Sequence, residues 1–224
     1  MTRTSHRDSL VDDLVADLKP TRRVWSPGVH LGFWLAIELL VFGLVASLAL
    51  RMDIMGQLAN LLFLVELTLL IAAGGLAAAM ALLAAVPGRE PSRGAVALAL
   101  ALLVASFVCL YEEMPAAART LATAPWGMRC AVETMAIAAV PWLALLLFAR
   151  RGASLMPVLS GGLAGLGAFL IAAAIMRVVC PVDHFWHLVL WHFSPVVVGL
   201  GISAAIGVLL LNAWREDDGG AVAS

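Results

Sequence analysis

Cysteine and histidine residues in the second half of the chain have the types and the spacing that could do chemistry. Cys180 is followed at helical spacing by His184 and His187, and Cys109 and Cys130 precede it. Thiolates and imidazoles bind thiophilic metal ions, whereas two thiols that meet in an oxidising compartment form a disulfide. The sequence therefore predicts a functional Cys130–Cys180 pair or a metal site that also uses His184 and His187. The alternative is that the cysteines fill space and the histidines anchor the chain at a membrane interface.

Three acidic residues, Glu38, Glu66 and Glu133, stand alone in long apolar stretches. An ionisable group inside a bilayer costs several kcal/mol, so these residues are candidates for a function. They could line a proton or cation route, or they could hold helices together by polar contacts. Glu133 falls in the first turn of its stretch, where the helix dipole favours an acid. Because no lysine or arginine is expected inside the stretches, the sequence predicts acids without basic partners.

Composition identifies the kind of element that must position these residues. The 224 residues are 62 % hydrophobic and 13 % charged, with a mean hydropathy of +0.99 and a formal net charge of −1. Soluble domains have about half apolar and about a quarter charged residues. The composition excludes a water-soluble domain. It also excludes a nucleic-acid binder, because there is no excess of basic residues to neutralise phosphates.

Six stretches reach the length of about 20 mostly apolar residues that a membrane-spanning helix needs. They are residues 29–50, 58–86, 94–111, 130–149, 153–176 and 188–214. We therefore expect an all-α integral membrane protein with a six-helix transmembrane domain at 29–214. A run of glycine and other small residues at 160–167 predicts close packing of the fifth helix. The flanking parts are predicted to be a cytoplasmic segment, 1–28, and a disordered tail, 215–224.

The distribution of basic residues predicts the orientation of the bundle. With both termini in the cytoplasm, ten basic residues lie on the cytoplasmic side: Arg3, Arg7, Lys19, Arg22, Arg23, Arg89, Arg93, Arg150, Arg151 and Arg215. Four lie in or beside the outer loops: Arg51, Arg119, Arg129 and Arg177. Cytoplasmic loops carry the excess of Lys and Arg, so both termini are predicted to be cytoplasmic in a bacterial inner membrane. Cys109, Cys130 and Cys180 then lie at or near the outer face.

Residues 9–19 have the apolar period of a short amphipathic helix that ends before Pro20. About three turns are marginal as an isolated helix in water, so this segment needs a surface to pack against. That surface is either the bilayer and the bundle or a protein partner that holds the helix in a groove. The acidic face disfavours an anionic lipid surface and favours the protein partner. The predicted partner-binding residues are Leu10, Val11, Asp13, Leu14, Asp17 and Leu18.

Taken as a whole, the chain resembles the NrsF-like family of bacterial inner-membrane anti-sigma factors, the negative regulators of an extracytoplasmic-function sigma factor. The similar residues run along most of the chain: 10–20, Trp34-Leu35, 64–68, 84–88, Cys130, Pro141, 150–153, Pro157, Cys180-Pro181-Val182-Asp183, His187 and Trp191-His192. Six spans with two outer cysteines in this order carry the resemblance.

The resemblance implies a function without an enzymatic reaction. The cytoplasmic N-terminal segment would hold the sigma factor at the membrane, and Cys130 and Cys180 would sense a periplasmic stress such as a heavy metal or an oxidant. The implied partners are the sigma factor and membrane lipid. No obligatory cofactor is implied, only a transient thiophilic metal ion. No role is assigned to Cys109.

Two other classes of protein, a transporter and a membrane enzyme that uses thiols or haem, compete with this interpretation. A small transporter or metal exporter would use the intramembrane acids together with the external cysteines and histidines, but only one acid is expected per helix. A membrane thiol oxidoreductase would need a Cys-x-x-Cys pair, which the sequence lacks. A haem protein would need two histidines at one depth, whereas His30 is predicted on the inner side of the membrane and His192 on the outer side.

Overall fold

The computed structural model describes residues 15, 25–152 and 154–211. All regular secondary structure within these ranges is helical. The predicted amphipathic helix, including Leu10, Val11, Asp13, Leu14, Asp17 and Leu18, lies outside the described residues apart from Val15. The predicted tail at 215–224 lies outside them as well.

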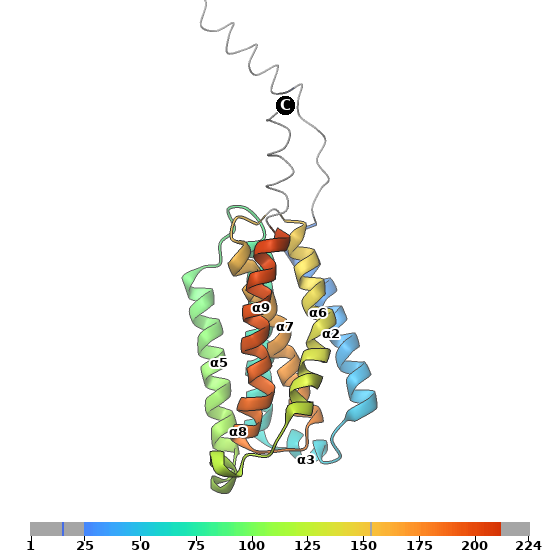
Figure 1. Cartoon of the computed structure of the whole chain (residues 1–224), viewed down its shortest axis with the longest axis vertical. Coiled ribbons are helices and arrows are strands. Elements are labelled where there is room, and N and C mark those ends of the chain that lie inside the picture. Colours follow the sequence, from blue (N-terminus) through green and yellow to red (C-terminus); the bar gives the residue numbers. More distant parts are fainter. Residues whose placement is uncertain (1–14, 16–24, 153, 212–224) are drawn as a thin grey trace, which may run out of the picture.

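Six long helices form an antiparallel bundle in the described part of the chain (Figure 1). They are α2 (Pro27–Ala49), α4 (Leu61–Ala84), α5 (Arg93–Glu113), α6 (Met128–Arg150), α7 (Pro157–Val179) and a sixth span, Phe185–Leu211. The sixth span consists of α8 (Phe185–Leu188), the π-helical η3 (Val189–Phe193) and α9 (Ser194–Leu211). The short connecting helices are α3 (Ile54–Leu58), η1 (Ala116–Arg119) and η2 (Leu121–Thr123). The predicted fold class is confirmed, and each predicted span overlaps one of the six helices.

Local sequence signals fix where several helices begin. Ser26, Asn60 and Ser92 cap α2, α4 and α5, and each side chain accepts a hydrogen bond from a backbone N–H in the first turn. Such a cap satisfies one of the N–H groups that have no partner within the helix. Pro27 and Pro157 occupy the first turns of α2 and α7, where the missing N–H of proline costs nothing.

Helix α7 lies at the centre of the bundle and packs against α4, α6 and α9. A Cβ atom at Gly161 would lie 2.5 Å from the carbonyl oxygen of Ser203 in α9. A Cβ atom at Gly167 would lie 2.8 Å from the backbone nitrogen of Ala78 in α4. Glycine at these positions lets the helix backbones approach closely, so the packing predicted from residues 160–167 is confirmed.

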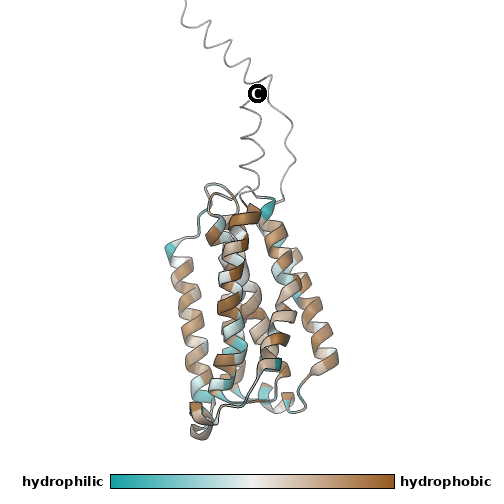
Figure 2. Ribbon diagram, viewed as in Figure 1, coloured by the Kyte–Doolittle hydropathy of each residue, from teal (hydrophilic) through white to brown (hydrophobic). Residues whose placement is uncertain are grey.

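The outward faces of the bundle are apolar. Large side chains such as Leu40, Leu48, Val197 and Leu209 are exposed, and Figure 2 shows that hydrophobic residues make up most of each long helix. An apolar surface of this extent is unfavourable in water and favourable in the hydrocarbon of a bilayer. All six helices are long and apolar enough to cross a membrane, and the chain is a multi-pass membrane protein.

The alternation of the six helices places the start of α2 and the end of α9 at the same end of the bundle (Figure 1). The opposite end, which we call the distal end, holds α3, η1, η2 and α8. It is also the end where the loop between α5 and α6 meets the loop between α7 and α8. The polar clusters described below all lie there.

Candidate functional site

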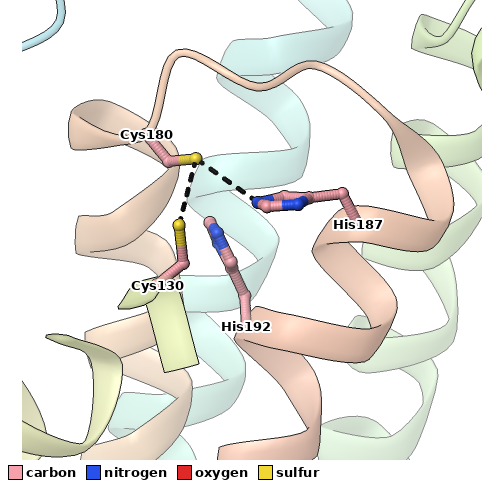
Figure 3. Close-up of side chains that lie close together, drawn as sticks. All are labelled: Cys130, Cys180, His187 and His192. Atoms are coloured by element: carbon pink, nitrogen blue, oxygen red, sulfur yellow. Dashed lines mark hydrogen bonds between the residues drawn. The ribbon is translucent and has the colours of Figure 1, made fainter. Parts of the chain in front are cut away.

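Four donor side chains meet at the distal end of the bundle. Cys130 lies in the first turn of α6, Cys180 directly follows α7, and His187 and His192 belong to α8 and η3. Their ligand atoms all lie within 4.8 Å of one another. Figure 3 shows the four side chains converging from α6, the end of α7 and the sixth span. We call this group the thiol–imidazole cluster.

The closest contacts in the thiol–imidazole cluster involve Cys180. Its Sγ lies 3.7 Å from the Sγ of Cys130 and 3.6 Å from Nε2 of His187. Both cysteines are free thiols. Cys180, His187 and His192 are buried and Cys130 is half-buried, so the group is shielded from solvent but has one partly accessible thiol.

The π-helical segment η3 brings His192 into the cluster. A π-helix places residues five apart above one another, and His187 and His192 have this spacing. The segment ends just before Pro195, which lacks the N–H that would bond to the carbonyl of Trp191 in a regular helix. The two imidazole rings pack edge-on against each other with centroids 5.5 Å apart.

The loop between α5 and α6 closes over the cluster. The carbonyl oxygen of Pro125 lies 3.1 Å from Nδ1 of His187, at hydrogen-bonding distance. Gly127 follows, and a Cβ atom at this position would clash with Cε1 of His187 and lie 2.7 Å from the ring of Trp191. Trp126 packs edge-on against Trp191. Close approach of the loop backbone therefore fixes the orientation of the His187 ring.

The predicted metal-ligand set differs from the observed cluster at one position. His184, which the helical spacing grouped with Cys180 and His187, points elsewhere, and its Nε2 lies 3.2 Å from Oγ1 of Thr123. The reason is that the chain after Cys180 is extended through His184, so the i, i+4 relation does not hold. His192 takes the fourth place; its i, i+5 spacing from His187, followed by a proline, is a sequence signal that could have identified it but was not used. Cys109 lies in α5 and is not part of the cluster.

A second polar cluster at the distal end is centred on Arg177. The guanidinium donates to Glu66 at 2.9 Å, to Glu113 at 3.0 Å and to Asp183 at 3.2 Å. Arg177 lies within α7 and is 1 % exposed, although the sequence placed it in an outer loop. The expectation that the apolar stretches contain no basic partner is therefore wrong for Glu66. The helix continues beyond the predicted boundary because an arginine paired with three carboxylates can be buried.

Asp183 links this cluster to the loop after α2. Arg51 donates to Asp183 at 2.6 Å and to Asp53 at 2.7 Å, and Gln57 donates to Asp183 at 3.1 Å. The hydrogen bond and charge of Arg51 lower the pKa of the exposed Asp53 to about 2. The two carboxylates in turn raise the pKa of Arg51. We call Arg51, Glu66, Glu113, Arg177 and Asp183 the Arg177 network.

The other two intramembrane acids have different surroundings. Glu133 forms an i, i+4 ion pair at 2.7 Å with Arg129, whose side chain is exposed. Glu38 is buried in α2, and its Oε1 has no hydrogen-bond partner among the described residues. It lines an apolar cavity of about 270 Å³ between α2, α4 and α7. The three acids therefore lie in three different environments: an exposed ion pair, a buried charge network and an apolar cavity.

These features define a class of protein: an all-helical, multi-pass membrane protein with a buried thiol–imidazole cluster and a paired charge network at one end. The family of negative regulators of sigma F matches residues 14–214, which is most of the chain. The chain belongs to this family. It is therefore a negative regulator of a sigma factor, and its partner is a sigma factor. No curated protein and no solved structure matches it.

Proposed function

We propose that this protein is an anti-sigma factor that holds an extracytoplasmic-function sigma factor at the bacterial inner membrane and releases it in response to periplasmic stress. The observation that carries the proposal is the 3.7 Å separation of the Cys130 and Cys180 thiols at the end of the bundle opposite the start of α2. A sensor and a partner-binding segment at opposite ends are what signalling across a membrane requires. The family match supplies the sigma factor as the partner.

The proposed orientation has both termini in the cytoplasm and the distal end in the periplasm. The excess of basic residues near the termini and in the loops at the same end supports this orientation. The placement of the start of α2 and the end of α9 at one end of the bundle is consistent with it. The thiols then face a compartment in which oxidants and heavy-metal ions reach them before they reach the cytoplasm.

The proposed binding element is the amphipathic segment at 9–19. Its apolar residues would lie in a groove of the sigma factor, and its aspartates would lie at the rim of the interface. A short helix that folds on binding spends part of its interaction energy on ordering. Attachment to the membrane domain keeps the segment at a high local concentration, which offsets that loss.

The proposed signal is a change in the Cys130–Cys180 pair. An oxidant that accepts two electrons would join the two sulfur atoms, with release of both thiol protons. A thiophilic metal ion would instead bind both sulfur atoms as thiolates. Either event would tie the start of α6 to the end of α7. Helix α7 contacts α4, α6 and α9, so a change at its end would pass to these helices. The bundle would then shift between two packings, and the ability of the N-terminal segment to bind the sigma factor would change.

The transporter alternative receives less support from the arrangement of the acids. Glu66 is paired with Arg177 and Glu133 with Arg129, which gives both acids a local structural role. Only Glu38 of the three predicted acids remains without a partner among the described residues, and one carboxyl group is not a route across a bilayer. Membership in a family of regulators also favours a function without catalysis.

The partner-binding part of the proposal is tested by Leu14→Asp in the full-length protein. A charge on the apolar face of the segment should remove a buried anchor and cost a few kcal/mol, which is about a hundredfold in affinity. Asp13→Lys is the matched control, because a change at the rim should alter the salt dependence more than the affinity. Binding is measured with purified sigma factor and protein in nanodiscs. Unchanged binding by Leu14→Asp would show that this segment is not the binding element.

The sensing part is tested by Cys130→Ser, Cys180→Ser and the double variant. All three should retain the sigma factor and lose its release by oxidant or metal to the same extent, because each variant removes the same pair. Cys109→Ser is the matched control and should respond as the wild-type protein does. Independent, additive effects of the two single variants would contradict a paired sensor.

A further inference from the structure

We propose that Cys130, Cys180, His187 and His192 form a tetrahedral binding site for a closed-shell divalent cation of the zinc group, Zn²⁺ or its thiophilic analogue Cd²⁺. This inference deepens the proposed function, because it names the ligand of the sensor and adds two histidines to the two thiols. It rests on the geometry of the thiol–imidazole cluster and on the hydrogen bonding of the two imidazoles.

The distances within the cluster fit a tetrahedral ion. Zinc lies about 2.3 Å from a thiolate sulfur and about 2.0 Å from an imidazole nitrogen, so a tetrahedral site separates two sulfurs by about 3.8 Å and a sulfur and a nitrogen by about 3.6 Å. The observed separations are 3.7 Å between Cys130 and Cys180 and 3.6 Å between Cys180 and His187. All four ligand atoms lie within 4.8 Å of one another, so small rotations of the side chains complete the site.

His187 has the second hydrogen bond that is typical of a metal-binding histidine. Its Nδ1 lies 3.1 Å from the carbonyl oxygen of Pro125, which accepts a hydrogen bond only if Nδ1 carries the proton. Nε2 is then the unprotonated nitrogen, and it is this atom that faces Cys180. A carbonyl that fixes the tautomer and the ring orientation in this way is the usual outer partner of a histidine ligand.

His192 is the residue that the cluster leaves unexplained without an ion. It is fully buried, and neither of its ring nitrogens has a hydrogen-bond partner among the described residues. Burial of an unpaired imidazole costs free energy, and a metal bond would satisfy one nitrogen. A hydrogen bond between the Cys180 thiol and His187 accounts for that pair alone and leaves His192 without a role.

The charge of the site selects the ion. Two thiolates and two neutral imidazoles carry a charge of −2, which a divalent cation neutralises in this buried position. Sulfur and nitrogen ligands favour zinc-group ions over Mg²⁺ and Ca²⁺, which prefer oxygen. Four protein ligands leave no open position for a substrate, so the site would be structural or regulatory rather than catalytic.

The site is tested by metal binding to the full-length protein in detergent. The protein is reduced, stripped with a chelator and then loaded with Zn²⁺, and we expect about one Zn²⁺ per chain by elemental analysis. Co²⁺ in its place should give the intense visible bands of tetrahedral cobalt and a thiolate-to-cobalt charge-transfer band in the near ultraviolet. Absence of both Zn²⁺ and Co²⁺ binding by the reduced wild-type protein would overturn the proposal.

Variants at the histidines separate the four-ligand site from a site made of the thiols alone. His192→Ala and His187→Ala should each weaken Zn²⁺ binding by at least about tenfold and change the cobalt spectrum. His184→Ala and Cys109→Ser are matched controls and should bind Zn²⁺ as the wild-type protein does. His192→Gln, which keeps the size and polarity of the side chain, guards against misfolding and should lose binding as His192→Ala does. Wild-type affinity in both His192 variants would overturn the four-ligand site.

The outcome is distinguishable from that of the proposed function, because metal binding is measured without the sigma factor. A protein that binds no metal but loses its oxidant response in Cys130→Ser would refute the site and keep the thiol sensor. A protein that binds Zn²⁺ through all four residues but releases no sigma factor under any stress would keep the site and refute the sensor.

Discussion

The two polar clusters at the distal end of the bundle satisfy their buried groups in opposite ways. In the Arg177 network the guanidinium donates to three carboxylates, and Arg51 and Gln57 supply further donors to Asp183. In the thiol–imidazole cluster the ligand atoms face one another, and His192 has no hydrogen-bond partner among the described residues. In the first cluster every charged side chain has an oppositely charged partner, and of its buried side-chain atoms only Oε1 of Glu66 has no hydrogen bond, whereas the second contains His192, both of whose ring nitrogens lack a partner among the described residues.

The difference separates a structural role from a regulatory one. A buried charge that has lost its partners is costly, so the Arg177 network should resist change and hold α4, α5 and α7 together. Neutral thiols and imidazoles are less costly to leave unpaired, so the thiol–imidazole cluster can exist both with and without a ligand. The two clusters lie close in sequence, since Arg177 precedes Cys180 by three residues. The Arg177 network would therefore hold the chain in place on one side of Cys180 when the thiols bind a ligand or are oxidised.

The largest expected effect is that of Arg177→Ala, which disrupts the Arg177 network. It leaves Glu66 and Glu113 buried without their counter-charge and should lower the free energy of unfolding by about 3–5 kcal/mol. The change is measured as a loss of thermal stability in detergent and of folded yield. The matched control is Arg129→Ala, which removes an exposed pair with Glu133 and should cost less than about 1 kcal/mol. Equal effects of the two variants would refute a special structural role for Arg177.

A smaller effect is expected for Gly127→Ala, which crowds the thiol–imidazole cluster without removing any of its four side chains. The new methyl group would clash with His187 and Trp191, and relief of the clash should cost about 1–3 kcal/mol. Displacement of His187 should also reduce the response to metal. The matched control is Gly201→Ala in α9, where nothing lies within 4 Å of the new atom. Gly127→Ala with wild-type stability and response would show that the loop does not position His187.

The smallest effect is expected for Asp53→Asn at the edge of the Arg177 network. Because Arg51 lowers the pKa of Asp53 from 3.8 to about 2, the ionised carboxylate stabilises the fold above about pH 4 and loses this contribution as the pH falls toward 2. The melting temperatures of the wild-type protein and the variant should therefore differ slightly at neutral pH and converge near pH 2. The difference is small because the side chain is exposed and screened by solvent. A difference that grows on acidification would contradict this assignment.

Most of the architecture could be predicted from the sequence. Long apolar stretches specify membrane-spanning helices almost independently of context, because each helix must satisfy its own backbone in lipid. The glycine run at 160–167 likewise predicted the close contacts of α7. The boundaries were less certain at polar residues: Arg177 belongs to α7 because its partners come from α4, α5 and a loop, and none of these is near it in sequence.

The candidate site, too, could be predicted only in part from the sequence. The sequence singled out Cys130, Cys180 and His187, whose atoms the structure brings together, but it grouped them with His184. Helical spacing was the wrong guide there, because the residues from Cys180 to His184 are extended. His192 was not predicted as a partner of the cysteines, since its relation to His187 depends on a π-helical turn that regular helical spacing does not describe.

The sequence by itself determined that this chain forms six helices long and apolar enough to cross a membrane, and it singled out the two cysteines and the family. These properties depend on composition, chain order and local capping, which are present before the chain folds. The tertiary structure alone decided which polar groups meet: Arg177 with Glu66 and Glu113, and His192 with the thiols. The physical reason is that a buried ion pair or a set of metal ligands depends on distances between helices. Those distances are set by the packing of α7 against its neighbours and by one turn of π-helix.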